Sequence, residues 1–295
     1  MNPFADQLIV RTRTLGPLCV GIDPHAGRIP ALFGGDTPQG LAVWGKALVT
    51  LAAGNVAAVK PQVGLFERHG PDGMAALQTV AAQARANDLL VIMDAKRGDI
   101  GSTAEGYAAA YLNPGAPFES DCVTVNPYMG LDTLEPFLTR AETHGKGVAV
   151  LARTSNPGSA DFQMLESGGA PVWANVTSAL ARLSPRLAGK SGWSSLMLVA
   201  GATGPGEARR MRELAPKCPF LVPGYGAQGA GAKDALAGFV PGPTGVLEGG
   251  VVNASRAVTF PSAAESADTA AAWDRAIITA IEDAQADLKS AAGAH

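Results

Sequence analysis

The residues best suited to do chemistry lie in the segment VIMDAKRGDIGST, residues 91–103. An apolar run ends there in Asp94, Lys96 and Asp99. Because side chains alternate along a strand, Asp94 and Lys96 should project to one side, and Asp99 follows after a glycine-assisted turn. The spacing therefore predicts one ammonium group between two carboxylates, which favour its charged form. A charged Lys96 suits a proton donor or a stabiliser of developing negative charge. A Schiff-base lysine needs a lowered pKa instead, so that its amine is neutral.

Two further apolar runs end in an ionisable residue. Asp23 closes VGID and Lys60 closes VAAVK, so charges repeat at three consecutive run ends. If the runs are parallel strands of a barrel, their carboxyl ends meet at one face, which carries the active site in such folds. A cluster of Asp23, Lys60, Asp94 and Lys96 in an inert core would be costly. We therefore predict that these four residues form a charge-balanced catalytic site.

Two glycine-rich segments late in the chain are candidates for phosphate binding. They are PGYGAQGAG, residues 223–231, and EGGVVNASR, residues 248–256. In barrels of this kind, phosphate is commonly held by the loops after the last two strands, where free backbone N–H groups point at the anion. Arg256 can add a bidentate charged contact, and Gln228 can fold over the phosphate as a donor.

The sequence offers little sign of a metal or an organic cofactor. The histidines His25, His69, His144 and His295 show no metal-ligand spacing, and the chain contains neither a Walker-type loop nor G-x-S-x-G. His25 and His69 could line the mouth of the site, but we expect them to be solvated loop residues. We predict an enzyme without metal or cofactor.

Regularly spaced elements can position these residues. Short apolar, β-branched runs recur as strands buried on both faces of a parallel sheet do, at 18–22, 56–60, 89–94, 122–126, 148–152, 196–200, 220–223 and 251–253. Crossover helices are expected between them, for example at 74–86, 131–143, 172–186 and 207–214. Eight such repeats predict an α/β fold, a (β/α)₈ TIM barrel. The N-terminus predicts a short amphipathic helix, and residues 264–295 predict a helix followed by a frayed Ala/Gly tail.

Composition limits the class of protein. The 295 residues include 23 Lys+Arg and 26 Asp+Glu, a net charge of −3, which argues against a nucleic-acid partner. The hydrophobic content of 47% supports a large core. Length suggests about two domains of roughly 150 residues, but α/β barrels of roughly 250 residues are an exception. Since no linker divides the sequence, we expect residues 1–295 to form a single domain.

Cysteine usage and hydropathy predict a cytoplasmic protein. Cys19, Cys122 and Cys218 lie about a hundred residues apart, which suits neither paired disulfides nor a zinc ribbon and indicates a reducing compartment. The first residues lack the basic and apolar regions of a signal peptide, and no apolar stretch reaches 18 residues, so we expect no membrane span.

Taken together, these motifs resemble the orotidine 5'-phosphate decarboxylase family, and within it the bacterial subgroup with longer loops, type 2. The resemblance covers about 80% of the chain, in order, through GIDP (21–24), VKPQ (59–62), DAKRGDIGSTA (94–104), VNPYMG (125–130), RTSNPGS (153–159), PGYGAQG (223–229) and NASR (253–256). It implies a cofactor-independent carboxy-lyase that acts on a small nucleotide, converting orotidine 5'-phosphate to uridine 5'-phosphate in pyrimidine biosynthesis.

The resemblance also implies a role for each matching residue. Lys60, Asp94, Lys96 and Asp99 would form an alternating charged network in which Lys96 protonates C6 of the pyrimidine. Asp99 and Thr103 would reach into the neighbouring subunit's site, so a homodimer is expected. The substrate contacts would be made by Asp23 and Lys60 to the ribose, Ser155 to the pyrimidine, and Gln228 and Arg256 to the phosphate.

Three other functions fit part of the pattern. A related sugar-phosphate barrel, such as a hexulose-phosphate synthase or a keto-gulonate-phosphate decarboxylase, resembles this chain at D-x-K-x-x-D but uses magnesium. A Schiff-base aldolase could employ Lys60 or Lys96. A catalytically silent barrel would only bind nucleotide phosphates, although the intact Asp94, Lys96 and Asp99 argue against it.

Overall fold

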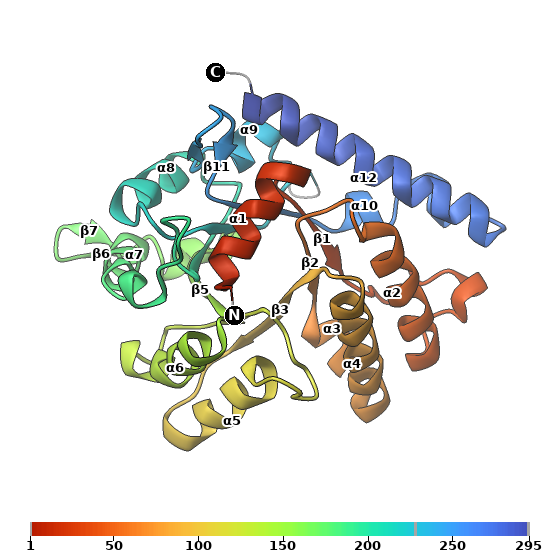
Figure 1. Ribbon diagram of the computed structural model, residues 1–295, viewed down its shortest axis with the longest axis horizontal. Coiled ribbons are helices and arrows are strands. Elements are labelled where there is room, and N and C mark those ends of the chain that lie inside the picture. Colours follow the sequence, from red (N-terminus) through yellow and green to blue (C-terminus); the bar gives the residue numbers. More distant parts are fainter. Residues whose placement is uncertain (1, 227–228, 294–295) are drawn as a thin grey trace.

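A closed parallel barrel of eight strands forms the centre of the molecule (Figure 1). The computed structural model describes residues 2–226 and 229–293. Around the barrel the strands follow the order β1-β12-β9-β8-β5-β4-β3-β2, and β2 pairs with β1 to close it. Their bounds are β1 Leu18–Ile22, β2 Ala58–Pro61, β3 Leu90–Arg97, β4 Cys122–Val125, β5 Gly147–Arg153, β8 Leu196–Ala200, β9 Phe220–Val222 and β12 Gly250–Ala254. Every predicted apolar run falls on one of these strands, which confirms the predicted single-domain TIM barrel.

Most of the helices surround the barrel on its outside, and the first one lies across one end of it (Figure 1). The longer ones are α1 Phe4–Leu15, α2 Pro38–Ala52, α4 Gly70–Ala86, α5 Gly101–Leu112, α6 Glu135–His144, α7 Val172–Ala181, α8 Pro205–Leu214 and α12 Ala270–Gly293. The short ones are α3 Val63–Glu67, α9 Ala232–Ala235, α10 Arg256–Thr259 and α11 Ser262–Glu265. The helix predicted over 172–186 ends earlier, at Ala181, and a 3-10 turn at Ser184–Leu187 follows, where Pro185 cannot continue an α-helix. The final helix α12 continues to Gly293, and the last two residues of the predicted tail lie outside the described residues.

The hydrophobic core has two layers. A large outer layer fills the space between strands and helices, and a smaller inner layer fills the barrel itself. Phe4 and Leu8 of α1 belong to the inner layer, so this helix closes one end of the barrel (Figure 1). A Cβ atom at Gly147 would lie 2.4 Å from the Phe4 ring, so only glycine fits there. With its amino-terminal end closed, the barrel interior can open to a ligand only at the carboxyl ends of the strands.

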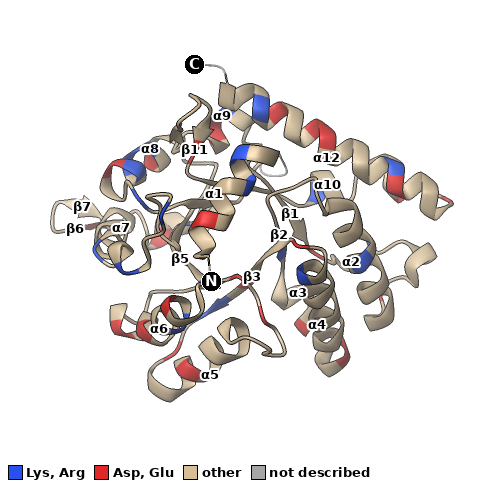
Figure 2. Ribbon diagram, in the orientation of Figure 1, with Lys and Arg blue, Asp and Glu red and all other residues tan. Residues whose placement is uncertain are grey.

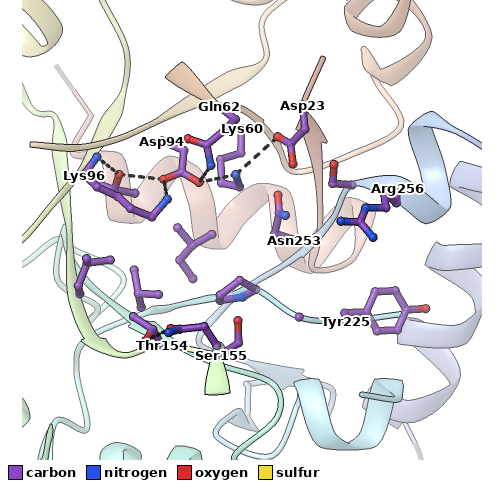
Figure 3. Close-up of a pocket in the computed structure, with 18 of the residues that line it drawn as sticks. Asp23, Lys60, Gln62, Asp94, Lys96, Thr154, Ser155, Tyr225, Asn253 and Arg256 are labelled. Carbon is purple, nitrogen blue, oxygen red and sulfur yellow. Dashed lines mark hydrogen bonds and ion pairs between the residues drawn. The ribbon is translucent and has the colours of Figure 1, made fainter. Parts of the chain in front are cut away.

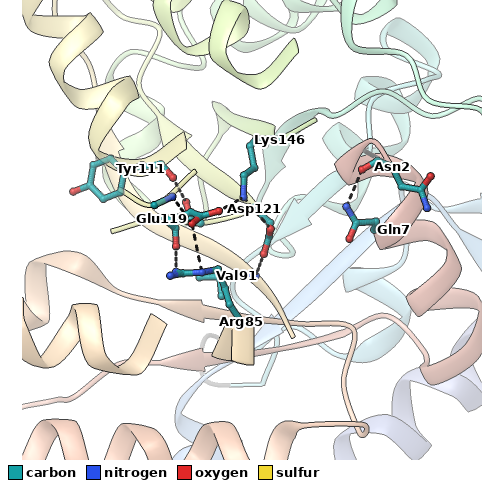
Figure 4. A network of polar contacts seen from close by, with 10 residues as sticks. Asn2, Gln7, Arg85, Val91, Tyr111, Glu119, Asp121 and Lys146 are labelled. Carbon is teal, nitrogen blue, oxygen red and sulfur yellow. Dashed lines mark hydrogen bonds and ion pairs between the residues drawn. The ribbon is translucent and has the colours of Figure 1, made fainter. Parts of the chain in front are cut away.

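A polar network stabilises the closed end (Figure 4). Lys146, which is buried, pairs with Glu119 Oε1 at 3.0 Å and Asp121 Oδ1 at 3.4 Å. The other oxygen of Asp121 accepts a hydrogen bond from the Val91 N–H at 2.9 Å, and Arg85 donates to the Glu119 carbonyl. These contacts join the starts of β3, β4 and β5, the end of a barrel where side chains generally serve stability.

The surface charges of both signs are interspersed on the outer helices, as on α12 (Figure 2). This agrees with a net charge close to zero for 295 residues. In the two ranges that the structure describes, no helix is both long and apolar enough to cross a bilayer.

Candidate active site

A cavity of about 440 Å³ opens at the carboxyl ends of the strands (Figure 3). Three neighbouring strands supply the four charged residues predicted to act together: Asp23 follows β1, Lys60 lies in β2, and Asp94 and Lys96 lie in β3. Ser155 and Arg256, which come from the segments after β5 and β12, also line it. The cavity thus brings together six of the predicted site residues.

The charged side chains form a chain of contacts along one wall (Figure 3). Lys60 Nζ lies 2.6 Å from Asp94 Oδ2 and 4.0 Å from Asp23 Oδ1, and Lys96 Nζ lies 2.5 Å from Asp94 Oδ1. Within one chain the arrangement is therefore a carboxylate between two ammonium groups. The predicted arrangement, Lys96 between Asp94 and Asp99, is only half present, because Asp99 is not among the residues lining this cavity.

Two neutral residues that the sequence did not single out complete the contacts of Asp94. Gln62 Nε2 donates to Asp94 Oδ2 at 3.0 Å, and Thr124 Oγ1 donates to Asp94 Oδ1 at 3.1 Å. Each carboxylate oxygen thereby has one ammonium and one neutral donor. The sequence does contain a hint of both residues. Thr124 is the one polar residue in the apolar run CVTV, and Gln62 directly follows the strand β2.

Burial and charge together set the ionisation of this cluster. Burial alone would raise the pKa of Asp94, but the nearby Lys60 and Lys96 outweigh it and hold that pKa well below its usual range. Burial likewise opposes the charged form of Lys60, yet the Asp94 and Asp23 carboxylates raise the pKa of Lys60 above its ordinary value. Asp94 and Lys60 are therefore ionised at neutral pH.

Replacing Asp94 with asparagine should lower the free energy of unfolding at pH 7 by about 3 kcal/mol, because Lys60 stays buried without its close counter-charge. A depressed folded-state pKa means that Asp94 stabilises the fold above its unfolded pKa of about 3.9 and that this contribution disappears as the pH falls through the lower folded value. The difference between parent and variant should therefore shrink below about pH 4. Urea unfolding of both proteins from pH 7 to pH 3 measures it, and a difference independent of pH would contradict the ionisation assigned to Asp94.

The backbone of β3 is irregular at Lys96. Its φ of 47° lies in the left-handed region, which a side-chain-bearing residue rarely adopts. The pairing register between β3 and β4 shifts between Met93 and Arg97, so the strand bulges there. Asp94 and Lys96 do meet, but the bulge and not the predicted regular alternation brings them together.

The Asp23 end of the cavity has the features of a binding site for a polar ligand (Figure 3). Asp23 Oδ1, Asn253 Oδ1 and Ser255 Oγ are buried and have no hydrogen-bond partner among the described residues. Buried polar atoms normally have a partner, so these three indicate a ligand with donor groups. Arg256 lies at the same end, while Leu151, Val199, Leu221 and Pro223 provide an apolar surface suited to a flat ring.

The remaining predicted residues fall into three groups. Asp99 and Thr103 are described but lie outside the cavity of their own chain, where Asp99 Oδ1 accepts a hydrogen bond from the Ile100 N–H at 2.8 Å. Gln228 lies outside the described residues. His25, expected in solvent, instead forms part of the cavity wall. Burial, together with Arg256, Arg28 and Arg68, outweighs Asp23 and lowers the pKa of His25. His69 lies away from the cavity, with its Nε2 3.5 Å from Asp36 Oδ1.

Comparison with known proteins identifies the family. The family described as orotidine 5'-phosphate decarboxylase / HUMPS matches residues 16–274. The chain belongs to this family. An orotidine 5'-phosphate decarboxylase of Nocardioides is 43% identical over 238 residues, covering 79% of this chain and 85% of the relative. That of Leptothrix cholodnii is 39% identical over 284 residues, covering 95% and 96%.

Solved members of the orotidine 5'-phosphate decarboxylase family share the architecture. A crystal structure from Streptomyces avermitilis superimposes with a TM-score of 0.84 at 37% identity, covering 100% of this chain and 97% of that one. The OMP decarboxylase of Leishmania donovani gives a TM-score of 0.80 at 30% identity and covers 99% and 100%. The family resemblance therefore extends over the whole barrel.

Proposed function

We propose that this protein removes the carboxylate of orotidine 5'-phosphate as carbon dioxide and leaves uridine 5'-phosphate, a step of pyrimidine biosynthesis. The observation that carries the proposal is the Lys60–Asp94–Lys96 array beside an apolar surface, with Arg256 at the far end of the same cavity. A flat pyrimidine matches the apolar surface beside Asp94 and Lys96, and a phosphate matches Arg256. Between them, ribose hydroxyls match the Lys60 end of the charged array. The curated relatives with this activity cover most of the chain, which supports the same assignment.

In the proposed complex, each region of the cavity binds one part of the substrate. Arg256 binds the phosphate by charge-assisted hydrogen bonds, and Gln228 is the second phosphate ligand. Asp23, whose Oδ1 lacks a hydrogen-bond partner among the described residues, accepts a hydrogen bond from a ribose hydroxyl, and Lys60 donates to the ribose. Ser155 hydrogen-bonds the pyrimidine. This orientation directs the pyrimidine toward Asp94 and Lys96.

The chemical step breaks the bond between C6 and the carboxylate carbon. Carbon dioxide leaves, the electron pair stays on C6, and Lys96 Nζ donates its proton to that carbon and recovers one from water after product release. Asp94, held ionised, lies near the substrate carboxylate and disfavours the ground state. A preorganised ammonium stabilises the carbanion as it forms, and each tenfold gain in rate corresponds to about 1.4 kcal/mol of barrier.

We also propose a homodimer in which Asp99 and Thr103 complete the neighbouring site. Apolar side chains are exposed just after β3 and β4, where Ile100 is 62% and Tyr128 85% accessible, and Met129 and Leu131 are exposed nearby. Exposed apolar side chains of this kind mark protein interfaces. A second copy covering them would bury this surface beside Asp99.

The subgroup and the location of the protein are further parts of the proposal. We assign the chain to the bacterial subgroup with longer loops, because an extended segment separates β5 from α7. That segment holds a 3-10 turn, Pro157–Asp161, and a small hairpin of β6 Glu166–Ser167 and β7 Ala170–Pro171. The buried, unpaired thiols of Cys19, Cys122 and Cys218 support a cytoplasmic location.

A spectrophotometric assay tests the proposed function. Purified protein should consume the absorbance of orotidine 5'-phosphate and form uridine 5'-phosphate, at the same rate with and without EDTA. Loss of activity in EDTA would favour a magnesium-dependent sugar-phosphate chemistry, and absence of any turnover would overturn the proposal.

A further inference from the structure

The conformation of Lys96 needs support from its surroundings. A residue with a side chain keeps a left-handed backbone only where neighbouring groups hold it, and such residues cluster at functional sites. At Lys96 the φ of 47° coincides with the bulge between Met93 and Arg97, so neither regular strand pairing nor glycine flexibility explains it. The contacts on either side of the bulge must supply the support.

On the inner side, the support comes from Thr124. This residue of β4 is 1% exposed, and its Oγ1 accepts a hydrogen bond from the Lys96 N–H at 2.8 Å. The same hydroxyl donates to Asp94 Oδ1 at 3.1 Å. One hydroxyl therefore fixes the backbone of Lys96 relative to the carboxylate that its own ammonium contacts.

On the outer side, the support comes from Arg97. Its guanidinium pairs with Glu67 of α3, donates to Tyr111 Oη of α5 at 3.3 Å, and lies 5.5 Å from the centre of the Tyr107 ring. Its carbonyl accepts a hydrogen bond from the Asn126 N–H at 2.8 Å, after the end of β4. Arg97 is thus tied to two helices and to the neighbouring strand, while the preceding residue faces the cavity.

We propose that Thr124 and Arg97 are positioning residues that hold Lys96 from its two sides in the left-handed conformation needed for proton delivery. The inference rests on the proposed function, because it assigns these residues an effect through Lys96. Neither residue contacts the phosphate end of the cavity, so their removal changes the chemical step and leaves substrate binding intact. The structure thereby separates a group that binds substrate, Arg256, from groups that set the direction of the proton donor.

The decisive comparison is Thr124→Val against Thr124→Ser. Valine keeps the shape but loses both hydrogen bonds, whereas serine keeps the hydroxyl. We expect Thr124→Val to lower kcat by about 100-fold with KM little changed, because displacing a reacting group by about 1 Å has that effect. Thr124→Ser should retain most of the parental kcat, and calorimetry should give parental Kd values for uridine 5'-phosphate with both variants.

A matched control is available on α7. Thr177 is also fully buried, but its hydroxyl only donates back to the Trp173 carbonyl at 2.8 Å, away from the cavity. Thr177→Val should keep the parental kcat. If Thr124→Val also keeps the parental kcat, or if Thr124→Ser lowers kcat as much as Thr124→Val does, the proposed positioning role of Thr124 is overturned.

Arg97 provides an independent pair in case Thr124→Val does not fold, which failure to bind uridine 5'-phosphate would reveal. Arg97→Met should lower kcat more than Arg97→Lys, which keeps the charge but not the forked contacts, and neither should raise KM. Equal kcat in Arg97→Met and the parent would overturn the inference. If the parent protein does not decarboxylate orotidine 5'-phosphate, the proposed function is overturned, and with it the positioning role of Thr124 and Arg97.

Discussion

Replacing Lys96 with alanine should abolish decarboxylation while the protein stays folded. The ammonium is the proposed proton donor to C6 and the proposed stabiliser of the carbanion, and both contributions disappear together. General acid catalysis and preorganised charge are each worth at least about 100-fold, so the rate should fall by more than about 10⁴-fold. The side chain is 47% exposed, so its removal leaves no cavity in the core. Steady-state assays with orotidine 5'-phosphate, together with circular dichroism, measure both parts of this expectation.

The control for Lys96→Ala is Lys46→Ala, an exposed lysine on α2 that does not line the cavity. It should keep the parental kcat. The Schiff-base alternative is tested with the same proteins, since borohydride would trap a covalent substrate adduct on Lys60 or Lys96 and change the protein mass. If Lys96→Ala releases carbon dioxide as fast as the parent, the proposed mechanism is wrong.

The barrel could be predicted because the same short pattern of apolar residues recurs at each of its strands. Each strand is buried on both faces, so it is read as a short apolar run, and two of the eight, Leu18–Ile22 and Leu196–Ala200, have the predicted bounds. The short hairpins were missed because two-residue strands carry too little periodicity. A signal existed for the β6–β7 hairpin, since Gly168 and Gly169, both with positive φ, form its turn.

The charged part of the site could also be predicted, because parallel strands bring their carboxyl ends together. To predict that Asp23, Lys60 and Asp94 lie together, it was enough to find where their strands end. The contacts of Thr124 and Gln62 could not be predicted, since they depend on the register between neighbouring strands. The left-handed backbone of Lys96 depends on a bulge that no periodicity in the run 91–97 indicates.

Replacing Arg256 with alanine should lower kcat/KM for orotidine 5'-phosphate by about 100-fold, the loss expected for a charge-assisted contact worth about 2–3 kcal/mol. KM should rise as well, because the phosphate loses a ligand in the ground state. The matched control is Arg209→Ala, an exposed arginine on α8, which should keep both constants. If both constants stay at their parental values in Arg256→Ala, the phosphate assignment is wrong.

An assay with the nucleoside orotidine as substrate tests whether Arg256 acts through the phosphate. Orotidine lacks the group that Arg256 would bind, so parent and Arg256→Ala should turn it over at the same low rate. Arg256 begins α10, just after β12, whereas Lys96 belongs to β3, so the two residues reach the cavity from different sides of its mouth (Figure 3). Binding energy released at the phosphate can therefore lower the barrier only by holding the pyrimidine against the charged wall. A variant that slows orotidine as strongly as its phosphate would show that Arg256 acts on the charged wall itself and not through the phosphate.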